Sequence, residues 1–119
     1  MTYNEKKEIT WYLERNGYES NNGIKYIKKY HGGDTVVSVT VLAVGNKEYC
    51  VSAVCRTVLR LTGGIGGSVE LTRSVESLGD IIAVETNIGS QRDFMLKVIN
   101  NKMYNYETDK IPSQEKGHG

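Results

Sequence analysis

Hydrophobic and polar residues alternate along the centre of the chain, between Val36 and Leu61. In the run 36–44 the β-branched side chains of Val37, Val39 and Val41 fall on one side of an extended backbone, and hydroxyl side chains fall on the other. A two-residue period of this kind predicts a strand with one buried face. The residues 45–47, Gly-Asn-Lys, interrupt the run as a turn, and a second alternating run begins at Tyr49.

The two runs predict a hairpin whose register follows from its side chains. A three-residue loop at 45–47 sets Thr40 against Ser52 on one face. On the other face it gives the pairs Ala43–Tyr49, Val41–Val51, Val39–Ala53 and Val37–Cys55. A slip of one residue would put Val39 against Ser52, which mixes buried and exposed positions, so the first register is favoured.

A third extended segment precedes the hairpin, over residues 24–30. The dipeptide Gly32-Gly33 favours a two-residue turn, which would place Tyr26 opposite Val39 and Ile24 opposite Val41. Both turns then predict a three-stranded antiparallel meander with a single buried face. That face consists of Ile24, Tyr26, Val37, Val39, Val41, Tyr49 and Val51.

The N-terminal segment carries the pattern of an amphipathic helix. Thr2 followed by Glu5 is a capping-box spacing, and apolar residues recur at helical intervals after it. Gly17 is suited to the position that follows a helix end. We expect a helix from about Tyr3 to Asn16.

Two segments fit both a strand and a helix. Residues 50–61 match a helical period at Val51, Val54 and Val58, although their β-branched content and the hairpin register favour a strand. Residues 69–78 stay open between the two structures. The apolar run 81–84 is interpreted as a buried strand that ends near Asn87.

The C-terminal part predicts a second helix. Ser90 with Asp93 is another capping pattern, and the apolar residues after it indicate a helix over about 90–101. The alternative is a hairpin at 100–102 with a short strand at 103–106. Residues 107–119 are polar and are expected to be a disordered tail.

The fold predicted from these patterns is a single α+β domain over residues 1–106. It comprises an N-terminal helix, an antiparallel β-meander of four to six strands built around 24–61 and 69–87, and the second helix near 90–101. A chain of 119 residues with 39% hydrophobic residues has the size and composition of one ordinary domain.

Charge and cysteine content limit the classes of function. The net charge is +1, whereas nucleic-acid-binding domains usually carry a strongly basic footprint. No apolar run approaches the ~20 residues that cross a bilayer, and the polar N-terminus is unlike a signal peptide, so a cytoplasmic protein without membrane contact is expected. Cys50 and Cys55 fall on opposite sides of a strand, so we predict two buried free thiols rather than a disulfide.

The glycine-rich segment is the one motif that suggests a small ligand. Glycines at 63, 64, 66 and 67 follow a predicted strand, and Glu85 lies 19 residues past Gly66. A strand, glycine loop, helix and strand in that order would match a dinucleotide site. The spacing of Gly63, Gly64, Gly66 and Gly67 departs from Gly-x-Gly-x-x-Gly, however, and the preceding strand alternates instead of being continuously apolar. A flexible loop is favoured, and nucleotide binding is kept as an alternative function.

Other chemistry has little support. The chain has two histidines, His31 and His118, and no Cys-x-x-Cys pattern, so we expect no metal and no cofactor. His31 is interpreted as a turn residue. Asp80 and Glu85 are the one candidate pair of acids for general acid–base chemistry, with scattered surface carboxylates favoured over a pair.

A basic sheet face is the remaining candidate site. Lys25 and Lys29 lie on the outer side of the first strand, and Arg56 falls in the same row as Lys29. Such a face could hold an acidic partner or a nucleic-acid backbone. The candidate binding residues are Lys25, Lys29, Tyr30, Arg56 and Arg60.

The leading hypothesis is a small non-enzymatic binding protein that acts through protein–protein contact. It is motivated by the single small domain, the lack of a convergent catalytic constellation and the tyrosine-rich composition. Many accessory proteins of phages and mobile elements have this size, and some inhibit host defence nucleases, as anti-CRISPR proteins do. A nucleic-acid-binding module is a further alternative, and a homodimer stays open.

Overall fold

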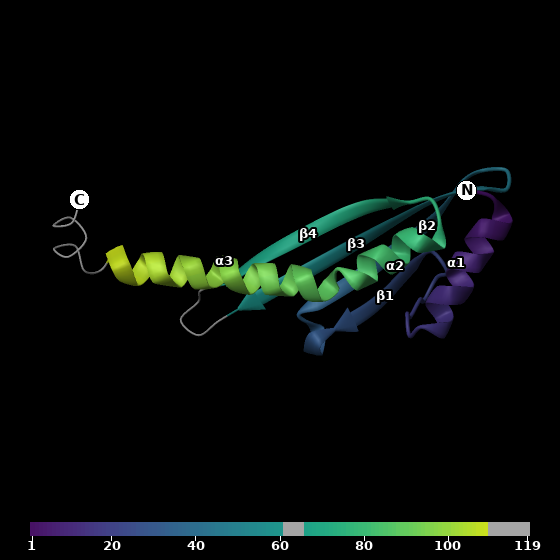
Figure 1. Ribbon diagram of the computed structural model, residues 1–119. Helices are drawn as coiled ribbons and strands as arrows, with labels where there is room; N and C mark the ends of the chain where they lie inside the picture. The colour runs from purple at the N-terminus through teal and green to yellow at the C-terminus, as the bar shows by residue number, and fades with distance from the viewer. Residues whose placement is uncertain (61–65, 110–119) are drawn as a thin grey trace.

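The computed structural model describes residues 1–60 and 66–109, with the side chains of residues 101–109 excepted. These residues form a four-stranded antiparallel sheet in the order β1-β2-β3-β4, with helices at both ends of the chain (Figure 1). The predicted α+β fold is therefore confirmed. The elements are α1 (Tyr3–Arg15), β1 (Lys25–Tyr30), η1 (His31–Gly33), β2 (Thr35–Gly45), β3 (Glu48–Arg60), β4 (Gly66–Val75), α2 (Leu78–Thr86) and α3 (Ile88–Asp109).

The predicted register of the central hairpin is confirmed. Val39 pairs with Ala53 and Thr40 with Ser52, and the other predicted pairs follow in step. The register shifts only at the tip, between Ala43 and Gly45. Side-chain alternation and turn length thus determine the pairing of β2 with β3.

The pairing of β1 with β2 is also as predicted, although the turn between them differs. Tyr26 pairs with Val39, and the backbone N–H of Val41 donates to the carbonyl of Ile24 at 2.7 Å. The connection is the short 3₁₀ helix η1 rather than a two-residue turn. One predicted core residue is misplaced, because Ile24 lies before β1 begins and its side chain is 44% exposed.

The two ambiguous segments are mainly strands: 50–61 is a strand as far as Arg60, and 69–78 is a strand as far as Val75, with Leu78 already in α2. β3 continues to Arg60, and β4 pairs with it without a register shift from Val51–Val75 to Arg60–Gly66. Leu61 and the rest of the connection up to residue 65 fall outside the described residues.

The strand predicted at 81–84 is wrong, because these residues form the middle of α2. Asp80 lies in the first turn of this helix, and its Oδ2 accepts hydrogen bonds from the backbone N–H groups of Glu76 at 2.8 Å and Ser77 at 3.2 Å. These bonds satisfy backbone donors just before the helix and favour its start at Leu78. Ile81 and Val84 then share the buried face of the helix.

The C-terminal helix is longer than predicted. α3 begins at Ile88, two residues before the predicted cap, and it continues to Asp109. The alternative strand at 103–106 is therefore wrong, and the first residues of the predicted polar tail, 107–109, belong to the helix. Residues 110–119 lie outside the described residues.

All three α-helices pack on the same face of the sheet. The main core joins Ile9 and Leu13 of α1, Ile81 and Val84 of α2, and the inward side chains of the strands. A second cluster joins Leu59 of β3 to α3. In Figure 1, α2 and α3 lie along one side of the sheet, and no described helix covers the other side. Residues on the helix side that are buried include Val37, Val39, Val41, Val51, Ala53, Cys55 and Val75.

Candidate interaction surface

The side of the sheet opposite the helices, which we call the open face, is uncovered by any described segment. Its central side chains are apolar or carry hydroxyl groups, and they are half-buried by their own neighbours in the sheet. An alternating strand places every second side chain there. The central residues are Ile27, Val36, Ser38, Thr40, Ser52, Val54 and Val58.

Four of the five predicted binding residues lie on the open face. Lys29, Val36 and Arg56 form one cross-strand row, which continues to Glu70 of β4. Lys25 lies at the start of β1, opposite Thr40. Arg60 ends β3. Within the described residues, none of these four cations forms an ion pair. Their charges face solvent, with Arg56 on the inner strand β3 and the other three at the margins of the open face.

Lys25 and Lys29 also border a groove of about 560 Å³ along the edge of β1. The segment between α1 and β1 forms its other wall, since Glu19 and Ile27 exchange two backbone hydrogen bonds of 2.9 Å. Asn22 Oδ1 accepts from the backbone N–H groups of Ile24 and Lys25 and holds the loop in place. The lining residues are Gly17, Glu19, Asn21, Asn22, Lys25, Ile27, Lys28 and Lys29.

Lys28 is the third lysine of this groove, and it points to the helix side. Its Nζ donates to the carbonyl oxygen of Asn16 at 2.7 Å. The same ammonium lies 5.0 Å from the ring centre of Tyr30 and 5.8 Å from that of Tyr18. This lysine is therefore engaged within the protein, whereas Lys25 and Lys29 remain available to a partner.

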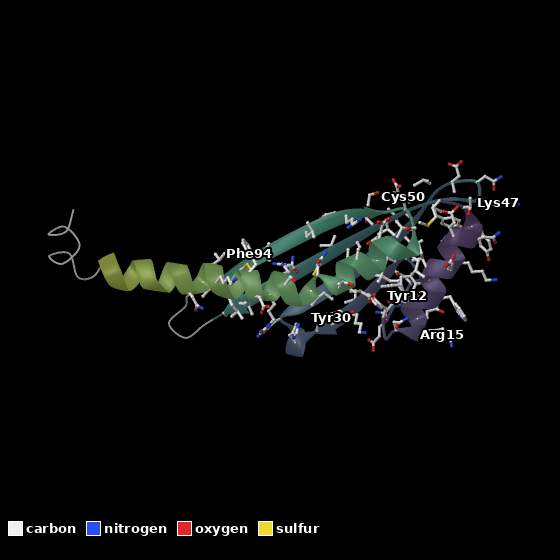
Figure 2. The ribbon with its side chains drawn as sticks, in the orientation of Figure 1. Tyr12, Arg15, Tyr30, Lys47, Cys50 and Phe94 are labelled. Carbon is white, nitrogen blue, oxygen red and sulfur yellow. The ribbon has the colours of Figure 1, made fainter. Side chains whose placement is uncertain are left out.

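Tyr30, the fifth predicted binding residue, lies on the helix side and not with the lysines of the open face. Together with Tyr12 and Tyr18 it surrounds the carboxylate of Glu85 on α2. Tyr12 and Tyr30 are labelled in Figure 2. The hydroxyl of Tyr12 donates to Oε1 at 2.5 Å, and those of Tyr18 and Tyr30 donate to Oε2 at 2.9 and 3.3 Å. This tyrosine–carboxylate cluster ties α1, β1 and α2 together.

The electrostatics of the cluster favour a structural role. The hydrogen bond to Glu85, helped by burial, raises the pKa of Tyr12 to about 12. Burial is the main cause that raises the pKa of Tyr18 and of Tyr30 above the ordinary value. Phenols with raised pKa stay protonated and are poor nucleophiles or bases at neutral pH.

The structure does not bring Asp80 and Glu85 together as an acid pair. Asp80 Oδ1 accepts from Arg73 Nη2 at 2.9 Å, and its other oxygen caps α2. Backbone hydrogen bonds, followed by the charge of Arg73, lower the pKa of Asp80. Each acid therefore has its own structural partners, and sequence spacing alone did not reveal them.

The two cysteines differ in their surroundings. Cys50 is exposed on the open face, which corrects the prediction of two buried thiols, and Cys55 is buried on the helix side. Cys55 Sγ lies 2.7 Å from Gln91 Oε1, and Thr57 Oγ1 donates to the same oxygen at 3.0 Å. Burial raises the pKa of the Cys55 thiol, so this buried network holds α3 against β3 without an activated sulfur.

The described part of the glycine-rich segment has a packing role. Gly66 and Gly67 begin β4, where Gly66 pairs with Arg60. A Cβ at Gly66 would lie 2.5 Å from the carbonyl oxygen of Leu59, and one at Gly67 would lie 3.0 Å from Met95 Cε. A strand follows the glycines and residues 81–84 are helical, so the strand–loop–helix–strand order of a dinucleotide site is not present. Gly63 and Gly64 lie outside the described residues.

The His, Cys, Asp and Glu side chains of residues 1–60 and 66–109 are dispersed. In these ranges no three His, Cys, Asp or Glu side chains gather in a way that could hold a metal ion. His31 lies exposed in η1 with a φ of 53°, while His118 is outside the ranges. None of the described helices is long and apolar enough to cross a membrane.

No protein-family model matches the chain, and neither a curated protein nor a solved structure is detectably similar to it. The functional argument therefore rests on the geometry of the open face and of the β1 groove.

Proposed function

We propose that this protein is a non-enzymatic binding protein that holds an acidic segment of another protein on its open face. The observation that carries the proposal is the distribution of side chains on that face. Its centre is apolar and hydroxyl-bearing apart from Arg56, which lies between Val54 and Val58 on β3, and its margins carry the exposed cations Lys25, Lys29 and Arg60. Protein interfaces commonly combine an apolar centre with a polar rim.

The charge of the open face selects the class of partner. Its strands present four cations and two carboxylates, those of Glu48 and Glu70, which leaves an excess of two positive charges. Glu70 is the direct neighbour of Arg56, so the excess is concentrated on Lys25, Lys29 and Arg60. Complementary charge favours an acidic partner and accelerates its association.

A protein partner fits this face better than a nucleic acid does. The described strands present no aromatic ring on the open face, because Tyr26 and Tyr30 point to the helices. Single-stranded nucleic acids are usually held by stacking on aromatic side chains beside a basic groove. The chain as a whole carries a net charge of only +1, far from a strongly basic footprint.

The proposal is tested by charge reversal at matched positions. One variant changes Lys25, Lys29 and Arg56 to Glu on the open face. The control changes the exposed residues Lys7, Lys47 and Lys97 to Glu. It also replaces three cations by three carboxylates, so the net charge changes by the same amount, but away from the open face. Proteins retained by the wild-type chain from a cell lysate are identified, and the retained protein is then purified for titration calorimetry.

We expect the open-face variant to bind the purified partner at least ~100-fold more weakly, because several charge pairs of about 1 kcal/mol each are lost or reversed. The control should bind within about threefold of the wild type. Equal binding of the partner by both variants would contradict the proposal. Capture that disappears on nuclease treatment would support the nucleic-acid alternative instead.

The finer expectations concern the partner and the compartment. A host defence nuclease as partner, in the manner of anti-CRISPR proteins, and a cytoplasmic location both stay predictions from the sequence. The identity of the captured protein tests the first of them directly. A captured protein that is basic on its contact surface would contradict the acidic-partner proposal even if it were a nuclease.

A further inference from the structure

We propose that two copies of this chain pair through β4 and form one continuous eight-stranded sheet. β4 is the last strand of the sheet, and no described residue pairs with its outer edge over the ten residues Gly66–Val75. The opposite edge, β1, is partly covered by the bridge between Glu19 and Ile27. An unpaired strand edge presents a row of backbone donors and acceptors that can pair with another strand.

β4 lacks the features that usually protect an exposed edge. It contains no proline and no lysine, and its pairing with β3 is free of bulges. Its two charged residues are Glu70 and Arg73, and Arg73 is held by Asp80 at 2.9 Å on its own chain. A long, regular and weakly charged edge is suited to strand addition.

An apolar patch lies beside this edge on the helix side. Leu71 of β4 is 50% exposed and Phe94 of α3 is 59% exposed, and both line a groove of about 240 Å³ between β4, α2 and α3. Figure 2 shows Phe94 on α3 alongside β4. A strand that paired with β4 would bring its own helix-side residues against Leu71 and Phe94 and would cover them.

The charges of β4 select the register of a symmetric pair. A two-fold axis perpendicular to the sheet keeps each face continuous, so a residue can be opposite only a residue of its own face. An axis through Glu70 or through Arg73 would set that residue against its own copy, and like charges directly opposite are destabilising. An axis through Thr72 would set Leu71 against Arg73.

An axis through Leu71 avoids the like-charge pairs, and the apolar residue that it sets against Arg73 is Val69, which is less exposed than Leu71. It joins the two Leu71 side chains on the helix side, next to the two Phe94 rings, and it sets Val69 against Arg73. On the open face it sets Glu70 against Thr72 and Ser68 against Ser74. In this register a second copy satisfies the free edge and covers the apolar patch.

The dimer would also enlarge the interaction surface. The axis keeps both open faces on the same side of the extended sheet, so two copies of the cationic margin face one direction. A partner with two acidic segments could then bind with increased avidity. The dimer itself does not depend on the proposed function, and it can be tested on the isolated protein.

The test measures the mass of the full chain in solution by sedimentation equilibrium over a wide concentration range. We expect a dimer for the wild type and a monomer for Leu71→Arg, which places two cations opposite each other. Leu42→Arg is the matched control, because Leu42 is 49% exposed at the far end of the open face. It should remain dimeric, and thermal unfolding should show that both variants are folded.

Cross-linking tests the register. In a Cys50→Ser background, Leu71→Cys should form a disulfide-linked dimer on mild oxidation, whereas Glu70→Cys should form it at least ~10-fold more slowly because its copy lies diagonally across the axis. A monomeric wild type at concentrations up to about 0.5 mM would overturn the proposal, as that bounds Kd in the millimolar range. A dimer that survives Leu71→Arg, or equal cross-linking at both positions, would overturn it as well.

Discussion

The two faces of the sheet are built from the same strands, yet their surroundings differ. On the helix side, Val37 and Val39 are fully buried against α1 and α2. On the open face, their neighbours Val36 and Val54 are covered only by adjacent side chains. One face thus stabilises the domain, and the other has apolar and cationic groups that no described segment covers.

This division predicts that stability depends on the parity of the residue along a strand. Adjacent residues of a strand point to opposite faces, so matched valine substitutions on the central strands β2 and β3 can separate the contributions of the two faces.

Val39→Ala should destabilise the domain far more than Val54→Ala does. Val39 has no exposed surface, so its truncation loses buried area and leaves a cavity, at a cost of about 2–3 kcal/mol. Val54 is half-buried on the open face, and we expect a loss below ~1 kcal/mol. Urea unfolding of both variants measures the difference. Similar losses would mean that the open face is also covered, for instance by a second protein chain.

Gly66→Ala should destabilise the protein, although Gly66 begins β4 on the open face, where we expect other substitutions to cost little stability. The added Cβ would meet the carbonyl oxygen of Leu59 at 2.5 Å, which is rigid backbone, and the resulting shift should cost about 1–2 kcal/mol. Gly89→Ala is the control, because Gly89 lies in α3 with open space around its Cα. Alanine there should stabilise by up to ~1 kcal/mol. Thermal or urea unfolding should therefore give opposite signs for the two variants, and equal signs would contradict the close approach of β4 to β3.

The central meander could be predicted from sequence because local signals agreed with one another. The alternation of valines with hydroxyl residues, together with two short connections, left one register in which Val39 meets both Tyr26 and Ala53. The run 81–84 was wrongly predicted as a strand because four apolar residues fit a strand and a helix equally well. The deciding signal was Asp80, three residues after Ser77, which satisfies backbone donors at the start of α2.

The functional groups were harder to predict than the fold. Lys25, Lys29, Arg56 and Arg60 could be placed on one face because their positions follow from strand parity. The tyrosine–carboxylate cluster could not be predicted, because Glu85 is separated from Tyr12 by 73 residues and from Tyr30 by 55. Its assembly depends on how α1 and α2 pack over the sheet, which no local pattern encodes.

The tyrosine–carboxylate cluster should make the helix side sensitive to alkaline pH. The pKa of Tyr12 is raised from 10.0 to about 12. Above pH 10 the unfolded chain loses a phenolic proton that the folded chain keeps, so the unfolded state binds fewer protons and stability falls as pH rises. The contribution of Tyr12 is therefore complete below pH 10 and is lost between pH 10 and about 12.

Tyr12→Phe measures this contribution. At pH 8 the variant should be less stable than the wild type by about 1 kcal/mol, the usual value of one hydrogen bond. The difference between the two proteins should shrink as pH rises above 10. Tyr49→Phe is the control, since Tyr49 is also half-buried but makes no bond to Glu85. A difference that stays constant up to pH 11.5 would show that the phenol of Tyr12 is not held by the carboxylate.

The smallest expected effect concerns the rates at which the two cysteines react with a thiol reagent. This test compares reaction rates and does not depend on a change in stability. Cys50 is exposed on the open face, while Cys55 is buried and its thiol has a raised pKa. A thiol reagent such as Ellman's reagent should label Cys50 at once. Cys55 should react at least ~100-fold more slowly, because it must wait for α3 to separate from β3. Cys50→Ser should leave only the slow phase, and a fast reaction of Cys55 in that variant would mean that the helix side opens readily.

The fast phase also reports on the open face, since a protein partner that covers this face should slow the labelling of Cys50 while the slow phase stays unchanged.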